Sequence, residues 1–277
     1  MRGLAEFVMK DSRYAAATVL ILGLIPLVNM LSPVLVGLSI MRRGLTGTFF
    51  LIAWALIPLV GWSLYGDAIP LILLFGVGAA AWVLRASDSW QFTLTVAILV
   101  GFFVEMFLRV QPESMEVLYQ QLDQVMVQSD LGTGADALRQ EMRALMPSLI
   151  GTVYAFLTAF LVMVSRWMQA SLYNNGGFGR EFRSFRISST FATLLVAGSF
   201  FSNFGLLPTG WLVYFCLPLF FAGAGLAHGV VKIKSLPRVW LVGFYVILML
   251  PISAQLVVLV ALCDSWLDFR GRIARAM

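Results

Sequence analysis

The chain has little charge and few of the side chains that enzymes use. Only 12% of its 277 residues are charged, and it contains one histidine and two cysteines. A single histidine excludes a metal site built from several histidines and leaves only His228 to activate a serine or cysteine nucleophile. Zinc-protease, nucleophile-elbow and P-loop motifs are also absent from the sequence. We therefore expect a protein that is not an enzyme and that uses no catalytic residue, cofactor or metal.

Apolar sequence, by contrast, is abundant. Hydrophobic residues make up 60% of the chain, which is more than one soluble core of this size can bury. The 19 basic residues outnumber the 14 acidic ones, but they lie in short clusters beside apolar runs, which indicates membrane topology and not nucleic-acid binding. We predict an all-α, polytopic transmembrane helical bundle, with the lipid bilayer as a partner and no nucleic acid.

The apolar runs predict about eight or nine membrane spans, the first two of them short. The run 14–41 is too long for one span and two prolines interrupt it, so we expect two short helices joined by a turn. Arg42 and Arg43 then return to the side of the basic residues in an amphipathic N-terminal helix, 1–13. The other spans are predicted at 46–65, 69–84, 91–108, 148–165, 187–204, 210–231 and 239–262.

One sizeable stretch, 111–146, is hydrophilic, and it separates an N-terminal membrane bundle, 1–110, from a C-terminal one, 147–277. It contains six acidic residues, Asp130 among them, and no lysine. This composition is typical of a segment exported from the cytoplasm. Apolar residues at helical spacing predict two short helices, the second starting at Asp136 after a break at 132–134. We expect a small extracytoplasmic helical hairpin.

The last apolar run allows two interpretations. A single span at 239–262 places the basic tail, 264–277, outside, against the positive-inside tendency. A bend at Pro251 instead makes the run a hairpin and returns the tail to the cytoplasm. Within the tail, Asp268 and Arg272 are one helical turn apart and are expected to pair.

The loop 173–186 is basic, aromatic and rich in glycine, and we expect it on the cytoplasmic side. Arg180, Arg183 and Arg186 recur every third residue, so they can face lipid phosphates or a partner, with phenylalanines on the other face. Anchoring at the membrane surface and specific docking of a partner or an anionic lipid are both open interpretations.

Two ionisable residues lie inside predicted spans. Glu105 precedes Arg109 by four residues, so the two can form an internal ion pair, and a proton or cation site is the alternative. His228 lies between Gly225 and Gly229, a spacing of small residues that lets helices approach closely. For His228 we therefore weigh a packing role against a proton relay.

Two asparagines, Asn29 and Asn203, lie next to helix breaks. Each can satisfy backbone groups that the break leaves free. They can also line a binding site together with Glu105, as discontinuous helices do in transporters. The candidate ligand-binding residues are Asn29, Glu105, Asn203 and His228.

Three segments of the second half carry a family resemblance. They are YNNGGFGREF at 173–182, Ala227 with His228, and DSWLDFR at 264–270. In these segments the chain resembles the proteobacterial branch of the YybS-like family of bacterial inner-membrane proteins. The opening, with PVLVG at 33–37 and RRG at 42–44, is similar to the substrate-capture subunits of energy-coupling-factor vitamin transporters. The resemblance implies no role for any residue, because the family has no established activity.

The leading hypothesis is a non-enzymatic membrane protein that binds or transports a small solute or lipid, as a capture subunit does. The alternative is a scaffold for envelope or membrane-protein assembly, in which the exported hairpin and the arginine loop dock a membrane-protein partner. A cavity distinguishes the two, because a transporter of solutes needs a polar pocket between its helices whereas a scaffold is packed solid there.

Overall fold

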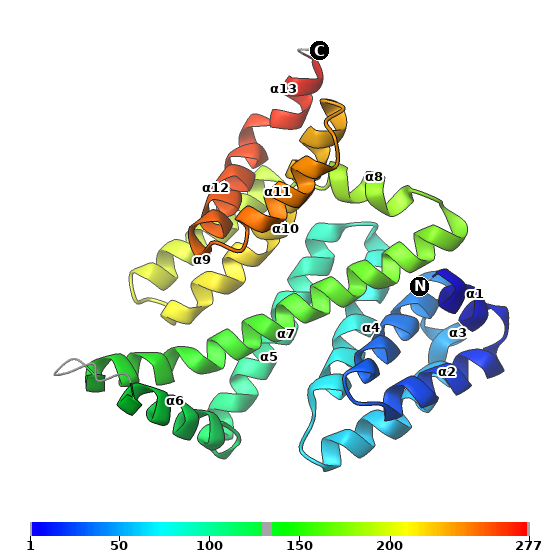
Figure 1. The fold of residues 1–277 in the computed structure, drawn as a ribbon, viewed down its shortest axis with the longest axis horizontal. Coiled ribbons are helices and arrows are strands. Elements are labelled where there is room, and N and C mark those ends of the chain that lie inside the picture. The colour runs from blue at the N-terminus through cyan, green and yellow to red at the C-terminus, as the bar shows by residue number, and fades with distance from the viewer. Residues whose placement is uncertain (1, 129–134, 276–277) are drawn as a thin grey trace.

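The computed structural model describes residues 2–128 and 135–275 as a bundle of α-helices (Figure 1). These described residues contain no strand. Within these ranges, five helices are long and apolar enough to cross a membrane, and two bent helix pairs would raise that number to seven. The predicted all-α, polytopic bundle of a multi-pass membrane protein is therefore confirmed.

Short connections join most of the helices. Their bounds are α1 (Arg2–Lys10), α2 (Ser12–Leu24), α3 (Leu31–Leu64), α4 (Ile69–Ser87), α5 (Trp90–Val110), α6 (Glu116–Gln128), α7 (Ala135–Tyr173), α8 (Gly177–Ser184), α9 (Ser189–Asn203), α10 (Leu212–Ile233), α11 (Val239–Ile247), α12 (Pro251–Leu267) and α13 (Phe269–Arg275), with 3-10 turns η1 (Val28–Met30), η2 (Pro112–Met115) and η4 (Thr209–Trp211). In Figure 1, α7 crosses the middle of the molecule, with α1–α4 on one side and α9–α13 on the other.

The apolar run 14–41 forms two short helices, as predicted. They are α2 and the first half of α3, and η1 lies in the turn between them. Gly44, with a φ of +78°, breaks α3 into two halves. Across this break the Ser39 and Thr48 hydroxyl oxygens lie 3.0 Å apart in a hydrogen bond. The second half of α3 is the span predicted at 46–65.

The predicted return of Arg42 and Arg43 to the N-terminal helix is also confirmed. Arg43 donates hydrogen bonds to the Ser12 hydroxyl at 3.0 Å and to the Met9 carbonyl at 3.3 Å. The Arg42 guanidinium lies over the ring of Tyr173, 4.5 Å from its centroid. Because Tyr173 ends α7, these arginines and the loop 173–186 share one end of the bundle, which we call the arginine end.

Helix α7 connects the two ends of the bundle. Its 39 residues span roughly 58 Å at about 1.5 Å per residue. The separate short helix predicted from Asp136 is wrong, because α7 continues through Pro147 into the span predicted at 148–165. Proline has no N–H for the Arg143 carbonyl one turn earlier, and that carbonyl accepts a bond from the Tyr119 hydroxyl of α6 at 3.5 Å instead. The helix therefore tolerates this proline.

The predicted hydrophilic hairpin consists of α6 and the first turns of α7. Asp123 of α6 pairs with Arg139, at 3.4 Å, and with Arg143, both on α7. The predicted break at 132–134 and Asp130 lie outside the described residues. The hairpin and the arginine end lie at opposite ends of α7 (Figure 1), and we call the first the hairpin end.

The run 239–262 is not one continuous helix. It consists of α11 and α12, which are bent by 114° relative to each other. Beyond α12, Arg270 donates hydrogen bonds to the carbonyls of Arg183, at 2.9 Å, and Phe185, at 2.6 Å, where α8 ends. The chain thus returns to the arginine end, as the hairpin interpretation predicts.

Candidate functional site

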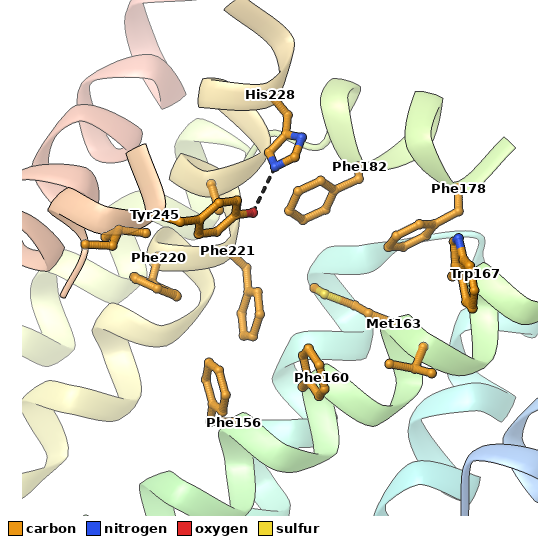
Figure 2. A pocket seen from close by; sticks show the side chains of 13 residues that line it. Phe156, Phe160, Met163, Trp167, Phe178, Phe182, Phe220, Phe221, His228 and Tyr245 are labelled. Carbon is orange, nitrogen blue, oxygen red and sulfur yellow. Dashed lines mark hydrogen bonds between the residues drawn. The ribbon is translucent and has the colours of Figure 1, made fainter. Parts of the chain in front are cut away.

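A cavity of about 520 Å³ lies between helices α7 and α10. Helices α7 and α10 form its long walls, α8 covers it at the arginine end, and α11 closes one side (Figure 2). Most of the wall consists of aromatic side chains, namely Phe156, Phe160, Trp167, Phe178, Phe182, Phe220, Phe221 and Tyr245. None of the described residues that line it is an aspartate, glutamate, lysine or arginine. The cavity is therefore apolar and uncharged.

Helical spacing places these rings opposite one another. Phe156, Phe160 and Trp167 recur on one face of α7, and Phe221 and His228 on one face of α10. The rings of Phe156 and Phe221 stack across the two helices with their centroids 5.5 Å apart. Toward the arginine end the two faces separate, and the cavity occupies the space between them (Figure 2).

At the hairpin end, α5, α7 and α10 are in close contact. A Cβ atom on Gly151 of α7 would lie 2.0 Å from the Tyr214 hydroxyl of α10 and 2.5 Å from the Gly101 carbonyl oxygen of α5. Tyr214 is fully buried and donates a hydrogen bond to the Gly101 carbonyl at 3.2 Å. These contacts hold α10 against α5 and α7 on the hairpin side of the cavity.

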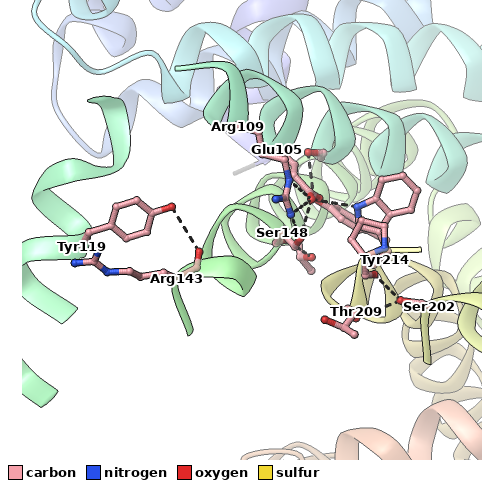
Figure 3. Close-up of polar contacts among 12 residues, drawn as sticks. Glu105, Arg109, Tyr119, Arg143, Ser148, Ser202, Thr209 and Tyr214 are labelled. Carbon is pink, nitrogen blue, oxygen red and sulfur yellow. Dashed lines mark hydrogen bonds and ion pairs between the residues drawn. The ribbon is translucent and has the colours of Figure 1, made fainter. Parts of the chain in front are cut away.

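Glu105 joins the same three helices (Figure 3). Its side chain is 1% exposed, and its Oε1 accepts bonds from Arg109 at 2.8 and 2.9 Å, confirming the predicted ion pair. The same oxygen accepts bonds from the Ser148 hydroxyl of α7 at 2.8 Å and from the Trp211 indole N–H, just before α10, at 3.1 Å. The carboxylate therefore cross-links α5, α7 and the start of α10.

His228 lies at the end of the cavity nearest the arginine end. Its Nε2 and the Tyr245 hydroxyl of α11 are 2.8 Å apart in a hydrogen bond (Figure 2). The predicted close approach beside it is confirmed, because a Cβ on Gly225 would lie 2.4 Å from the Phe182 carbonyl oxygen, and one on Gly229 3.1 Å from that of Arg183. The small residues thus let α8 lie directly on α10.

The three arginines of the loop 173–186 have different surroundings. Arg180 donates to the Asn174 side-chain oxygen at 3.0 Å. Arg186 pairs with Asp268 at 2.9 Å, so the predicted pairing of Asp268 with Arg272 is wrong. A residue that is distant in sequence reaches Asp268 because α13 folds back onto α8. Arg183 has no ion-pair partner among the described residues.

The four candidate ligand-binding residues lie on four different elements of the fold. Asn29 is buried in η1, between α2 and α3. Asn203 is exposed at the end of α9 and does not bond to Glu105. Of the four, His228 alone lines the 520 Å³ cavity. No hydrogen bond among the described residues joins Asn29 or Asn203 to Glu105, so the site that these three residues would share stays a prediction.

A second cavity, of about 430 Å³, lies at the arginine end and has a mixed polar wall. The two arginines in this wall, Arg85 and Arg166, already form hydrogen bonds with other residues of the protein. Arg85 donates to the Met41 carbonyl at 2.7 Å, and Arg166 forms two bonds with the Glu181 carboxylate. These bonds tie α3 to α4 and α7 to α8, so we assign the arginines a structural role.

No protein-family model matches the chain, and neither a curated protein nor a solved structure is similar to it. The resemblance to the YybS-like family therefore stays a prediction. Functional inference rests on the geometry of the 520 Å³ cavity and of the residues around it.

Proposed function

We propose that this multi-pass membrane protein is not an enzyme and that it holds a hydrocarbon chain, such as that of a lipid, in the cavity between α7 and α10. We place it in the bacterial inner (cytoplasmic) membrane, as the resemblance to the YybS-like family implies. The observation that carries the proposal is the cavity itself, with an aromatic wall, no charged residue and a volume of about 520 Å³. That volume is within the usual range for small-molecule sites, roughly 300–1,000 Å³.

The character of the wall favours a lipid over a polar solute. A polar solute would lose its hydrogen bonds to water on entering a site where almost every group is hydrocarbon, which costs several kcal/mol. A hydrocarbon chain loses no such bonds and gains dispersion contacts with the aromatic rings. The cavity also argues against a purely structural scaffold, which would be packed solid between these helices.

Helix α11 offers the hydrocarbon chain of a lipid a route from the bilayer into the cavity. It is highly apolar, none of its residues is buried, and it lies along one side of the cavity. The hydrogen bond between Tyr245 and His228 holds it to α10. A helix with so little buried surface can move with a small loss of packing, so a lipid can enter sideways.

Filling the cavity tests the proposal. Ala224 is 5% exposed and lines the cavity, so Ala224→Phe should occupy part of it. We expect native mass spectrometry of the purified full chain to show at least a fivefold loss of retained phospholipid. Leu194→Phe is the matched control, because Leu194 is 63% exposed on α9 and does not line the cavity. Equal retention by the two variants would contradict the proposal.

A further inference from the structure

We call the end of the apolar cavity beside His228 and α8 its mouth, and this end carries positive charge that the wall lacks. Arg183 follows the cavity-lining Phe182 on α8, and its backbone lies against α10 next to His228, since a Cβ on Gly229 would come within 3.1 Å of the Arg183 carbonyl oxygen. Lys232 lies four residues after His228 on α10, which places it on the same helix face one turn nearer the arginine end. Both cations therefore lie next to the polar end of the cavity.

No carboxylate of the described residues neutralises either of these cations. Three other arginines at this end do have a carboxylate nearby, since Arg166 pairs with Glu181, Arg186 with Asp268, and Arg270 lies 3.6 Å from Asp264. Within the described part of the chain, Arg183 and Lys232 have no ion-pair partner. The two elements that meet at the mouth of the cavity thus present unpaired positive charge.

The position of the mouth along the bundle also matches that of a lipid headgroup. It lies at the arginine end, where the basic residues of α1, Arg42 and Arg43 also gather. Clusters of basic residues are typical of the cytoplasmic membrane surface, where they attract anionic lipids. Arginine binds phosphate through its planar fork and lysine binds it as a point charge, so the two side chains complement a phosphate group.

We propose that the cavity takes an anionic phospholipid, with its chain between α7 and α10 and its phosphate on Arg183 and Lys232. This inference rests on the proposed function and adds the class of headgroup. An uncharged wall that opens onto unpaired cations matches a molecule with a hydrocarbon body and one negative end. In the second cavity, by contrast, Arg166 pairs with the Glu181 carboxylate and Arg85 already donates to the Met41 carbonyl.

The test compares phosphatidylglycerol with phosphatidylcholine of the same chains, added to the delipidated full-length protein and measured by native mass spectrometry. We expect the wild type to retain phosphatidylglycerol at least fivefold better. The double variant Arg183→Gln/Lys232→Gln should retain the two lipids about equally. The loss should be larger for phosphatidylglycerol, because the choline cation of phosphatidylcholine already offsets the charge of its phosphate. A preference that persists in this variant, or is absent from the wild type, would overturn the headgroup assignment.

A matched control removes the same charge elsewhere at the arginine end. Lys10→Gln/Arg13→Gln changes two exposed residues of α1 and α2, outside the cavity, and should keep the full preference. Loss of preference in this control would show a diffuse surface effect and overturn the site. Equal retention of both lipids by the wild type leaves the cavity proposal intact, whereas retention of neither lipid contradicts the proposed function itself.

A last arm separates a lipid headgroup from a free anion. Inorganic phosphate at millimolar concentration should leave bound phosphatidylglycerol in place, because phosphate alone gains nothing from the apolar wall. Displacement of the lipid by phosphate, with phosphate retained on the protein, would show that the cations serve a free anion and would overturn the lipid assignment.

Discussion

Gly151 shows how one small residue sets the spacing of three helices. Its missing side chain leaves room for the Tyr214 hydroxyl and for the Gly101 backbone, so α5, α7 and α10 meet below the cavity. The backbone oxygen of Gly101 cannot swing aside as a flexible side chain could. Any side chain at Gly151 must therefore push α7 away from its neighbours.

We expect Gly151→Ala to destabilise the protein by about 1–3 kcal/mol, the usual result of overpacking a filled core. Alanine favours helix formation over glycine by about 1 kcal/mol, which offsets only part of that loss. Unfolding by sodium dodecyl sulfate in mixed micelles measures the change. Gly61→Ala is the control, because a Cβ there meets nothing within 4 Å, and it should not destabilise. Equal stability of both variants would contradict the tight junction.

At this scale the sequence predicts local pairs and misses distant ones. The ion pair of Glu105 with Arg109 follows from their spacing of four residues. The bonds from Ser148 and Trp211 to the same carboxylate do not, since these residues are 43 and 106 positions away. The same limit explains why Asp268 pairs with Arg186 and not with Arg272, its neighbour along the chain.

Among the elements, α13 holds α8, the helix that covers the cavity, in place. Arg270 donates to the carbonyls of Arg183 and Phe185, where α8 ends, and to the Ala222 carbonyl of α10 at 3.1 Å. A cation is favourable at the carboxyl end of a helix, where carbonyls lack partners. Burial lowers the pKa of Arg270 and the nearby Asp264 raises it, and arginine stays charged at any physiological pH.

We expect Arg270→Gln to release α13 from α8, because the shorter neutral side chain cannot reach three carbonyls at once. Amide hydrogen exchange of 269–275 should become at least tenfold faster, as measured by mass spectrometry. Arg275→Gln serves as the control, because the Arg275 side chain bonds only to the Gly271 carbonyl within its own helix among the described residues. Unchanged exchange in Arg270→Gln would show that other contacts hold α13.

The sequence predicts the helices better than it predicts what lies between them. Apolar length and basic clusters identify the segments, and the breaks near Asn29 and Pro251 follow from turn and proline chemistry. The aromatic cavity was not predicted, although Phe156, Phe160 and Trp167 already recur at helical spacing. Spacing shows that rings share one face of α7, but only the tertiary fold shows that this face meets a gap and not another helix.

The whole molecule places its acidic hairpin and its basic loop at opposite ends of one long helix, α7. We expect single cysteines at Gln124 and Arg180, in a chain without Cys216 and Cys263, to react with membrane-impermeant maleimide from opposite sides of intact cells. A cysteine at Arg275 should behave like the one at Arg180, because α13 returns to the arginine end. Labelling of Gln124 and Arg180 from the same side would contradict this topology.

The arrangement also links the membrane to the cavity. The junction of α5, α7 and α10 keeps the hairpin end closed, whereas at the arginine end α8 and the loosely packed α11 cover an apolar space. One end of the bundle is thus fixed by close backbone contacts and a buried carboxylate. The other contains the volume that a hydrocarbon chain can fill.

Photo-crosslinking with a phospholipid that carries a diazirine in its acyl chain tests this account most directly. If the chain occupies the cavity, peptide mapping should find adducts concentrated on its wall, at Met163 of α7 and at Phe221 and Ala224 of α10. Leu194 and Phe200 of α9 are exposed outside the cavity and should react far less. Adducts spread over all exposed apolar residues, with no enrichment at the cavity wall, would contradict it.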